Sequence, residues 1–157
     1  AVALLAESEF VDIFGVENSL TPAMDLFTKL GYLGLTCRLN TDAYLQQIGA
    51  GHLPHGAVAV AFSHSGSSAD TVKALRLAKS HGAITNAIGA PPASWADVTL
   101  LTGRDSHTIY GNAIFSRVAD TALVDMLYMG VILSDYGRFS TALDESGRMI
   151  RDRVFEN

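Results

Sequence analysis

Five short runs of apolar residues alternate along the chain with longer segments in which apolar residues recur every three or four positions. The runs lie at residues Phe10–Phe14, Leu35–Leu39, Ala57–Phe62, Ile84–Ile88 and Val98–Leu101. The central run, Ala-Val-Ala-Val-Ala-Phe, contains no polar residue, which is typical of a strand buried on both faces of a parallel sheet. We therefore expect a five-stranded parallel sheet.

The segments between these runs have the spacing of amphipathic helices. Apolar residues at positions 23–30 share one helical face, with Thr21 as the expected N-cap and Pro22 at the first helical position. A short helix is expected after a Thr41 cap, and another over residues 69–81. This alternation predicts a doubly wound, flavodoxin-like α/β fold, with helices on both faces of the sheet in three layers.

A long apolar helix is expected from about Asn112 to about Ser134. Its apolar residues lie on more than one face and need cover on several sides, so we expect this helix at a subunit interface. Residues 1–9 are expected to form a lead-in helix. Residues 136–157 are more polar and fit either a final amphipathic helix or a frayed terminus.

The most distinctive polar segment follows the central run. It reads Ser63-His64-Ser65-Gly66-Ser67-Ser68. A helix N-terminus has unpaired N–H groups and a partial positive charge, so a hydroxyl-rich turn there can hold a phosphate. The simpler alternative is that Ser67 or Ser68 only caps the following helix. One cap needs one hydroxyl, however, and this turn supplies four.

This turn is neither a nucleotide P-loop nor a nucleophile elbow. It lacks the G-x-x-x-x-G-K-[ST] motif, and Ala61 stands where an elbow centred on Ser63 needs its first glycine. Because the turn has no lysine, a phosphate monoester is a better candidate than a triphosphate. Ser19 lies beyond the end of the first strand, and such loops meet at the ligand-binding edge of open α/β sheets. Ser19 is therefore a second candidate, with helix entry as its alternative role.

The Ser-x-Ser-Gly-x-Ser turn after an apolar strand resembles that of the sugar isomerase (SIS) domain. It is most similar to the effector domain of the RpiR/MurR family of bacterial transcriptional regulators. Three further segments support the resemblance, in the right order. They are Ile13–Ser19, Ala78–Ala83, and Ser116–Ala119 leading to Leu123–Leu127. The resemblance implies the three-layer SIS fold and covers most of the chain.

The resemblance also implies a sugar-phosphate site. The ligand-binding residues that it implies are Ser19, Ser63, Ser65, Gly66, Ser67 and Ser68, with Asn18, Tyr44 and His64 as lesser candidates. Serine hydroxyls would donate to the phosphate, and Gly66, which has no Cβ, would let backbone N–H groups come close. Tyr44 stands where many RpiR-type proteins have a histidine, so the sugar itself is left open.

Composition limits the classes of function. The 157 residues are 48% hydrophobic and 17% charged, as expected for one globular domain. Eleven Lys and Arg against sixteen Asp and Glu give a net charge of −5 without a basic stripe. Since nothing resembles a helix-turn-helix, we expect DNA contact only through a domain absent from this chain. The lone Cys37 is expected to be a packing residue in a reducing cytoplasm.

Neither a membrane span nor a metal site is expected. No apolar run reaches the ~18 residues that indicate a membrane span, and the start of the chain lacks the basic n-region of a signal peptide. His52 and His55 flank Pro54, but they have no third ligand nearby, so we expect no metal and no cofactor.

Three functions compete. The leading hypothesis is a sensor: a single SIS domain, residues 1–157, binds a phosphorylated sugar as a homodimer or tetramer and signals to an attached helix-turn-helix domain. The alternative is a sugar-phosphate aldose–ketose isomerase, which needs a placed base. Many SIS sequences have glutamate where this chain has Ser67, which leaves Asp105, His107 or His52 as base candidates. The third possibility is a degenerate SIS domain that serves only oligomerisation.

Overall fold

The computed structural model describes residues 1–90, 93–102 and 117–151. Its centre is a sheet in the order β2-β1-β3-β4-β5, in which every neighbouring pair is parallel. The strands are β1 (Val11–Phe14), β2 (Cys37–Leu39), β3 (Val58–Ser63), β4 (Ile84–Gly89) and β5 (Val98–Leu101). The five predicted strands are confirmed. The largest difference is at β2, because the Leu35 N–H still bonds to the Leu30 carbonyl at the end of the preceding helix.

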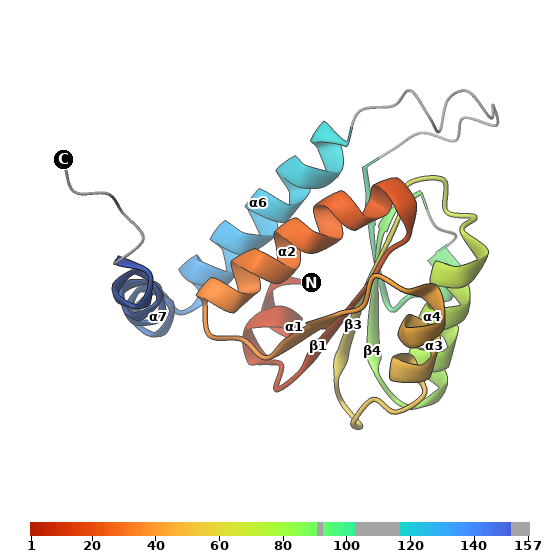
Figure 1. The fold of residues 1–157 in the computed structure, drawn as a ribbon, viewed down its shortest axis with the longest axis horizontal. Coiled ribbons are helices and arrows are strands. Elements are labelled where there is room, and N and C mark those ends of the chain that lie inside the picture. Colours follow the sequence, from red (N-terminus) through yellow and green to blue (C-terminus); the bar gives the residue numbers. More distant parts are fainter. Residues whose placement is uncertain (91–92, 103–116, 152–157) are drawn as a thin grey trace.

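Helices cover both faces of the sheet, as predicted (Figure 1). One face carries α1 (Val2–Glu7), α2 (Leu20–Tyr32) and α6 (Val118–Ser134), and the other carries α3 (Ala43–Ala50) and α4 (Ala69–Ser80). Two short 3₁₀ turns, η1 (Glu17–Ser19) and η2 (Ala93–Trp95), precede α2 and β5. The last helix, α7 (Tyr136–Met149), packs against α6 and α2. The predicted α/β fold with a parallel sheet and flanking helices is therefore confirmed.

The two faces of β3 differ in side-chain size. Val58, Val60 and Phe62 face the layer of α2 and α6, whereas the alternating alanines of the strand face α4, which contributes Ala74 and Ala78. Small residues on both sides of this contact permit close packing of α4 on the sheet. Because β3 ends at Ser63 and α4 begins at Ala69, only the short serine turn separates the strand from the start of this helix.

The predicted helix caps at Thr21 and Thr41 are wrong. Because η1 runs directly into α2, that helix begins at Leu20 with Ser19 as its N-cap, and Thr21 lies inside its first turn. The Asp42 carboxylate caps α3 by accepting a 2.9 Å hydrogen bond from the Leu45 N–H. Where capping residues are adjacent, the local sequence does not specify which of them the backbone uses.

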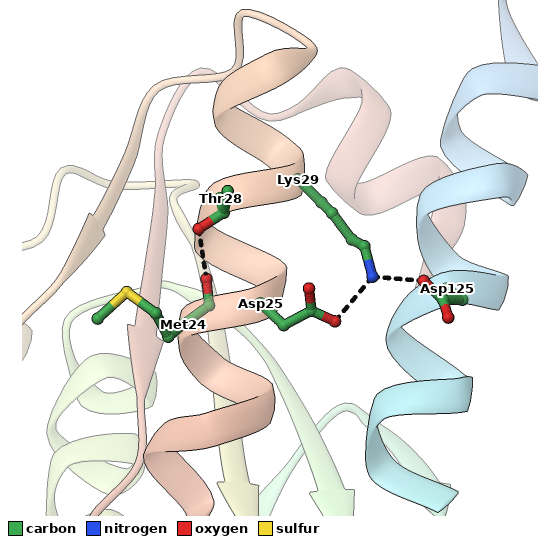
Figure 2. Close-up of polar contacts among 5 residues, drawn as sticks. All are labelled: Met24, Asp25, Thr28, Lys29 and Asp125. Atoms are coloured by element: carbon green, nitrogen blue, oxygen red, sulfur yellow. Dashed lines mark hydrogen bonds and ion pairs between the residues drawn. The ribbon is translucent and has the colours of Figure 1, made fainter. Parts of the chain in front are cut away.

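An ion-pair bridge joins α2 to α6. Figure 2 shows the Lys29 ammonium on α2 between the carboxylates of Asp25 and Asp125. Asp25 lies one turn earlier on the same helix, with 2.7 Å between Lys29 Nζ and Asp25 Oδ2, and Asp125 lies on α6. Burial acts to lower the pKa of Lys29, but the hydrogen bonds to Asp125 and Asp25 outweigh it and raise that pKa. Because Asp125 is mostly exposed, the bridge adds little stability.

The long apolar helix is present as α6, although residues 112–116 of the predicted span lie outside the described residues. Its inner face is buried in the core, but Met126, Met129 and Leu133 are 68%, 50% and 67% exposed. We call these three residues the α6 stripe. As the sequence predicted, α6 therefore has apolar residues on more than one face, and those of the α6 stripe face outward.

Helices lie within both terminal segments for which the sequence suggested them, although residues 152–157 lie outside the described residues. The lead-in helix is α1, and the C-terminal segment forms α7, an amphipathic helix anchored by the buried Phe139. In the part of the chain that the structure describes, no helix is both long and apolar enough to cross a membrane.

Cys37 is expected to react slowly with thiol reagents. Its Sγ donates to the Leu35 carbonyl at 3.4 Å, and burial raises its pKa to about 12. Because the thiolate is the reactive form, alkylation by iodoacetamide at about pH 8 should be at least ~50-fold slower in the folded protein than in urea, even after allowing for the higher nucleophilicity of a high-pKa thiolate. Equal rates in the two states would show that Cys37 is accessible and reactive.

Candidate functional site

The first residues of α2, α4 and α6 lie near the edge of the sheet where β1 and β3 end (Figure 1). The N-terminal ends of these three helices border one cavity. The N-cap residues are Ser19 for α2, Ser68 for α4 and Arg117 for α6, and all three line the cavity. Each helix N-terminus carries a partial charge of about +0.5. The convergence of three such ends, on helices of 13, 12 and 17 residues, makes the cavity favourable for an anion.

The cavity is small and its lining is mainly polar. The described residues that line it are Val16, Glu17, Asn18, Ser19, His64, Ser65, Ser68 and Arg117. Its volume is about 90 Å³, or roughly three water molecules at about 30 Å³ each. This is the scale of one phosphate group rather than of a complete sugar phosphate. A larger ligand would place its anionic group here and the rest outside.

Ser19 and Ser68 occupy N-cap positions, yet neither side chain caps its own helix. The backbone of Ser19 is already helical (φ −75°, ψ −11°), and an N-cap side chain bonds the first N–H groups from an extended backbone instead. Ser19 is only 7% exposed and lines the cavity. The simpler interpretation, in which Ser68 serves only as a cap, thus lacks the bond that it requires.

Ser65 is set up as a donor. Its Oγ accepts hydrogen bonds from the Ser67 N–H (3.3 Å) and the Ser67 hydroxyl (2.9 Å). A serine hydroxyl has two acceptor lone pairs and one proton. With both lone pairs engaged, the Ser65 O–H remains available to donate, and the residue lines the cavity. An anion is the partner that suits such a hydroxyl.

The other residues of the turn take different positions. Ser63 is buried and does not line the cavity, but its carbonyl accepts from the N–H groups of Gly66 (3.0 Å) and Ala90 (3.2 Å). Gly66 has φ +66°, a conformation that glycine adopts without strain. Ser67 is exposed and lines a separate groove along α4. The N–H groups expected to approach a phosphate, those of Gly66 and Ser67, are thus bonded within the turn.

Two contacts from neighbouring elements hold the turns in place. Gln46, buried on α3, donates to the Gly15 carbonyl at 2.7 Å and accepts from the Gly15 N–H at 3.3 Å, which clamps the start of the turn that carries Ser19. Gly89 ends β4 with φ +127°, and a Cβ there would lie 2.0 Å from the Ser63 carbonyl oxygen. Only glycine lets β4 pass this close to the serine turn.

His64 lines the cavity and also faces α6. Its Nδ1 lies 3.6 Å from the Asp120 carboxylate, and buried Asp120 accepts a hydrogen bond from Thr102 at the end of β5. Through this contact the serine turn is joined to the first turn of α6.

The two other lesser candidates differ. Asn18 lines the cavity. Tyr44 does not: it lies on α3, is 77% exposed, and is accompanied by exposed Leu45 and Ile48. Nor does Tyr44 pack in the core, because the residues that α3 buries are Gln46 and its C-terminal glycine and alanine.

Of the candidate isomerase bases outside the turn, the structure describes only His52. Asp105 and His107 lie outside those residues. His52 is exposed, and its Nδ1 lies 2.8 Å from the Ile48 carbonyl of α3. No group of three or more His, Cys, Asp or Glu within residues 1–90, 93–102 and 117–151 is placed to hold a metal.

Arg117, like Val16 and Glu17, lines the cavity but was not among the residues predicted for the site. It belongs to the Ser116–Ala119 segment, which supported the family resemblance but was not assigned a role in the site. The available signal was a cation at the start of a long helix. Only the packing of α6 against the serine turn brings it to the cavity.

No family model matches the sequence. An uncharacterized HTH-type transcriptional regulator from Caldanaerobacter subterraneus subsp. tengcongensis is 28% identical over 161 residues, covering 100% of this chain and 57% of that protein. The HTH-type transcriptional regulator RpiR of Escherichia coli is 24% identical, covering 88% of this chain and 48% of its own length. The chain spans about half the length of the curated relatives it matches.

Solved structures extend the comparison. The sugar isomerase domain of an RpiR transcription factor from Sphaerobacter thermophilus has a TM-score of 0.79 at 25% identity, covering 94% of this chain and 83% of that one. The Vibrio vulnificus NanR protein complexed with ManNAc-6P has a TM-score of 0.90 at 23% identity, covering 99% and 60%. Chains named as putative phosphosugar or sugar-phosphate isomerases, at 17 to 20% identity, share the fold with TM-scores of 0.63 to 0.70.

These similarities and the strand order define an SIS-type sugar isomerase domain. The chain is akin to the C-terminal part of RpiR- and NanR-family HTH regulators. The family resemblance and the fold predicted from the sequence are thereby confirmed.

Proposed function

We propose that this chain is a sugar-phosphate-binding effector domain of an RpiR-type transcriptional regulator. The observation that carries the proposal is the convergence of three helix N-termini on one polar cavity whose N-cap serines leave their hydroxyls unused by their own helices. A phosphate dianion is the ligand that such an arrangement favours. The NanR protein supports the choice of ligand class, since its structure is a complex with ManNAc-6P.

In the proposed complex, the hydroxyls of Ser65, Ser68 and Ser19 donate to phosphate oxygens. Ser63 supports the turn through its carbonyl, and the N–H groups of Gly66 and Ser67 would reach the phosphate by exchanging their present bonds within the turn. The sugar lies outside the small cavity. Asn18 and His64 border the cavity and are candidates for the first sugar contacts.

The proposed regulator works as an assembly. Residues 1–157 would form one effector domain, DNA would be contacted by a helix-turn-helix domain outside this chain, and the protein would act in the cytoplasm. The exposed α6 stripe supports self-association as a homodimer or tetramer, because apolar patches of this kind favour protein contacts. The net charge of −5 supports assigning DNA contact to another domain.

The second candidate is a sugar-phosphate isomerase. The specific observation in its favour is that His64 and Glu17, two titratable side chains, border the cavity, and proton transfer between adjacent carbons requires such a group. Against it, His64 faces Asp120, and Ser67 replaces the glutamate of many SIS sequences. We therefore rank the sensor function above catalysis.

Thermal unfolding with a panel of ligands tests the proposal. The panel contains ManNAc-6P, glucose 6-phosphate and other sugar phosphates, with the free sugars and inorganic phosphate as controls. A ligand at 100 times its Kd adds about 2.7 kcal/mol to the free energy of unfolding, which should raise Tm by roughly 5–10 °C. Stabilisation by a sugar phosphate that is recovered unchanged supports a sensor, and recovery as its isomer supports an enzyme. No shift with any phosphate contradicts both and leaves a purely structural domain.

A further inference from the structure

We infer that Arg117 is the cation that binds the phosphate dianion and gives the site its preference for phosphorylated over free sugars. This inference rests on the proposed function and adds to it a residue on a third element. The serine hydroxyls come from the turns after β1 and β3, whereas Arg117 comes from the start of α6.

The first observation is the bonding state of the guanidinium. Arg117 lines the cavity, and its Nε and Nη1 are buried without a hydrogen-bond partner among the described residues. A buried donor without a partner is costly, and more so when the group is charged. Arginine presents its N–H groups as a planar fork that fits two oxygens of one phosphate. Because Nε and Nη1 belong to different edges of the guanidinium, a phosphate in the cavity would satisfy one of these buried donors together with Nη2.

The second observation is the balance of charge around the cavity. Arg117 is the permanent cation among the described residues that line it; Glu17 is an exposed carboxylate on the same lining, and His64 faces the Asp120 carboxylate. A phosphate monoester carries a charge of about −1.5 to −2 at neutral pH. Hydroxyls carry no charge, and each helix end supplies only a partial one. The full positive charge of Arg117 would add to these partial charges and offset more of the charge of the ligand.

The third observation is that Ser19, which also lines the cavity, is more than nine-tenths buried, and no hydrogen bond of its hydroxyl is found within the described part of the chain. Donors without partners in the described residues, at the N-caps of α2 and α6, thus border the same small cavity. If Ser19 or Arg117 had a purely structural role, its donor groups would be expected to have hydrogen-bond partners within the protein.

Arg117→Gln and Arg117→Lys are the variants that test this inference, with Arg148→Gln on α7 as the matched control, because Arg148 is exposed on a helix that does not line the cavity. Binding of ManNAc-6P, glucose 6-phosphate and inorganic phosphate is measured by calorimetry on all four proteins. We expect Arg117→Gln to weaken sugar-phosphate binding by about 10- to 100-fold, the usual effect of losing hydrogen bonds to a charged group. Arg117→Lys should lose less, and Arg148→Gln should match the wild type.

Stability without ligand separates a binding role from a structural one. Because the two buried nitrogens have no partner in the described residues, Arg117→Gln should unfold at a Tm equal to or above that of the wild type. A lowered Tm together with weaker binding would overturn the inference in favour of a structural arginine. If the wild type binds a sugar phosphate and Arg117→Gln binds it with the same affinity, the inference is overturned and the proposed function still stands. A wild type that binds none of the three probes would overturn both.

Discussion

Replacing Ser65 with aspartate is expected to abolish sugar-phosphate binding while leaving the fold intact. The carboxylate would lie in the cavity that we assign to the phosphate, so the ligand would lose a hydroxyl donor and meet a like charge. We expect affinity to fall by at least about 100-fold, because a charge-assisted hydrogen bond alone accounts for about 10- to 100-fold. The measurement is calorimetry with the sugar phosphate that stabilises the wild type most.

Two controls make this experiment specific. Ser140→Asp introduces the same charge on α7, whose residues do not line the cavity, and should bind like the wild type. Ser65→Ala removes the donor without adding charge and should lose only about tenfold. In the absence of ligand, Ser65→Asp should keep or raise Tm, since a carboxylate near a helix N-terminus is stabilising. Undiminished affinity in Ser65→Asp would contradict the site assignment.

Replacing Arg38 with methionine is expected to have the largest effect on stability. Arg38 on β2 forms a bidentate pair with Asp12 on β1, at 3.0 Å from Nε to Oδ1 and 2.6 Å from Nη2 to Oδ2, and Asp12 is fully buried. Removing the cation leaves a buried carboxylate uncompensated, which costs about 3–5 kcal/mol. For a domain of this size, Tm should fall by roughly 10 °C. Thermal and urea unfolding measure the change.

The pH dependence identifies the cause of that loss. Burial already raises the pKa of Asp12 against the opposing hydrogen bond and charge of Arg38, and without Arg38 the pKa rises further. The folded variant then holds the Asp12 proton more tightly than the unfolded chain, so its stability falls as the pH rises through the raised pKa. The deficit relative to the wild type should therefore be smaller near about pH 5 than near about pH 8.

A double variant provides the control. Asp12→Asn combined with Arg38→Met removes both charges and should recover much of the stability lost in Arg38→Met, without its pH dependence. If Arg38→Met is equally destabilised at both pH values, lost packing rather than an uncompensated carboxylate is the cause. Packing is a real competitor, because Arg38 also lies 5.3 Å from the Phe10 ring and close to Gly49.

Much of the candidate site could be located from the sequence because it depends on strand ends. Once β1 and β3 are known to be parallel, the turns that follow them must lie at one edge of the sheet, which brings Ser19 and Ser68 to one cavity. The first residue of each helix was harder to predict from the sequence, because Thr21 and Thr41 are as suitable for capping as the observed N-cap residues Ser19 and Asp42. The sequence could not place Tyr44, which is exposed on α3, because the face that a helix buries depends on the helix it packs against.

The sequence by itself determined the five strands, the layers of helices and the hydroxyl-rich turn, because apolar periodicity and turn chemistry are local properties of the chain. The tertiary structure alone decided which polar groups meet. Arg117 and Ser65 are 52 positions apart in the numbering, yet the packing of α6 beside the serine turn brings both to one cavity. Likewise, only the fold shows that the Ser19 and Ser68 side chains leave their own helices uncapped. These are long-range relations, and side-chain spacing along the sequence does not encode them.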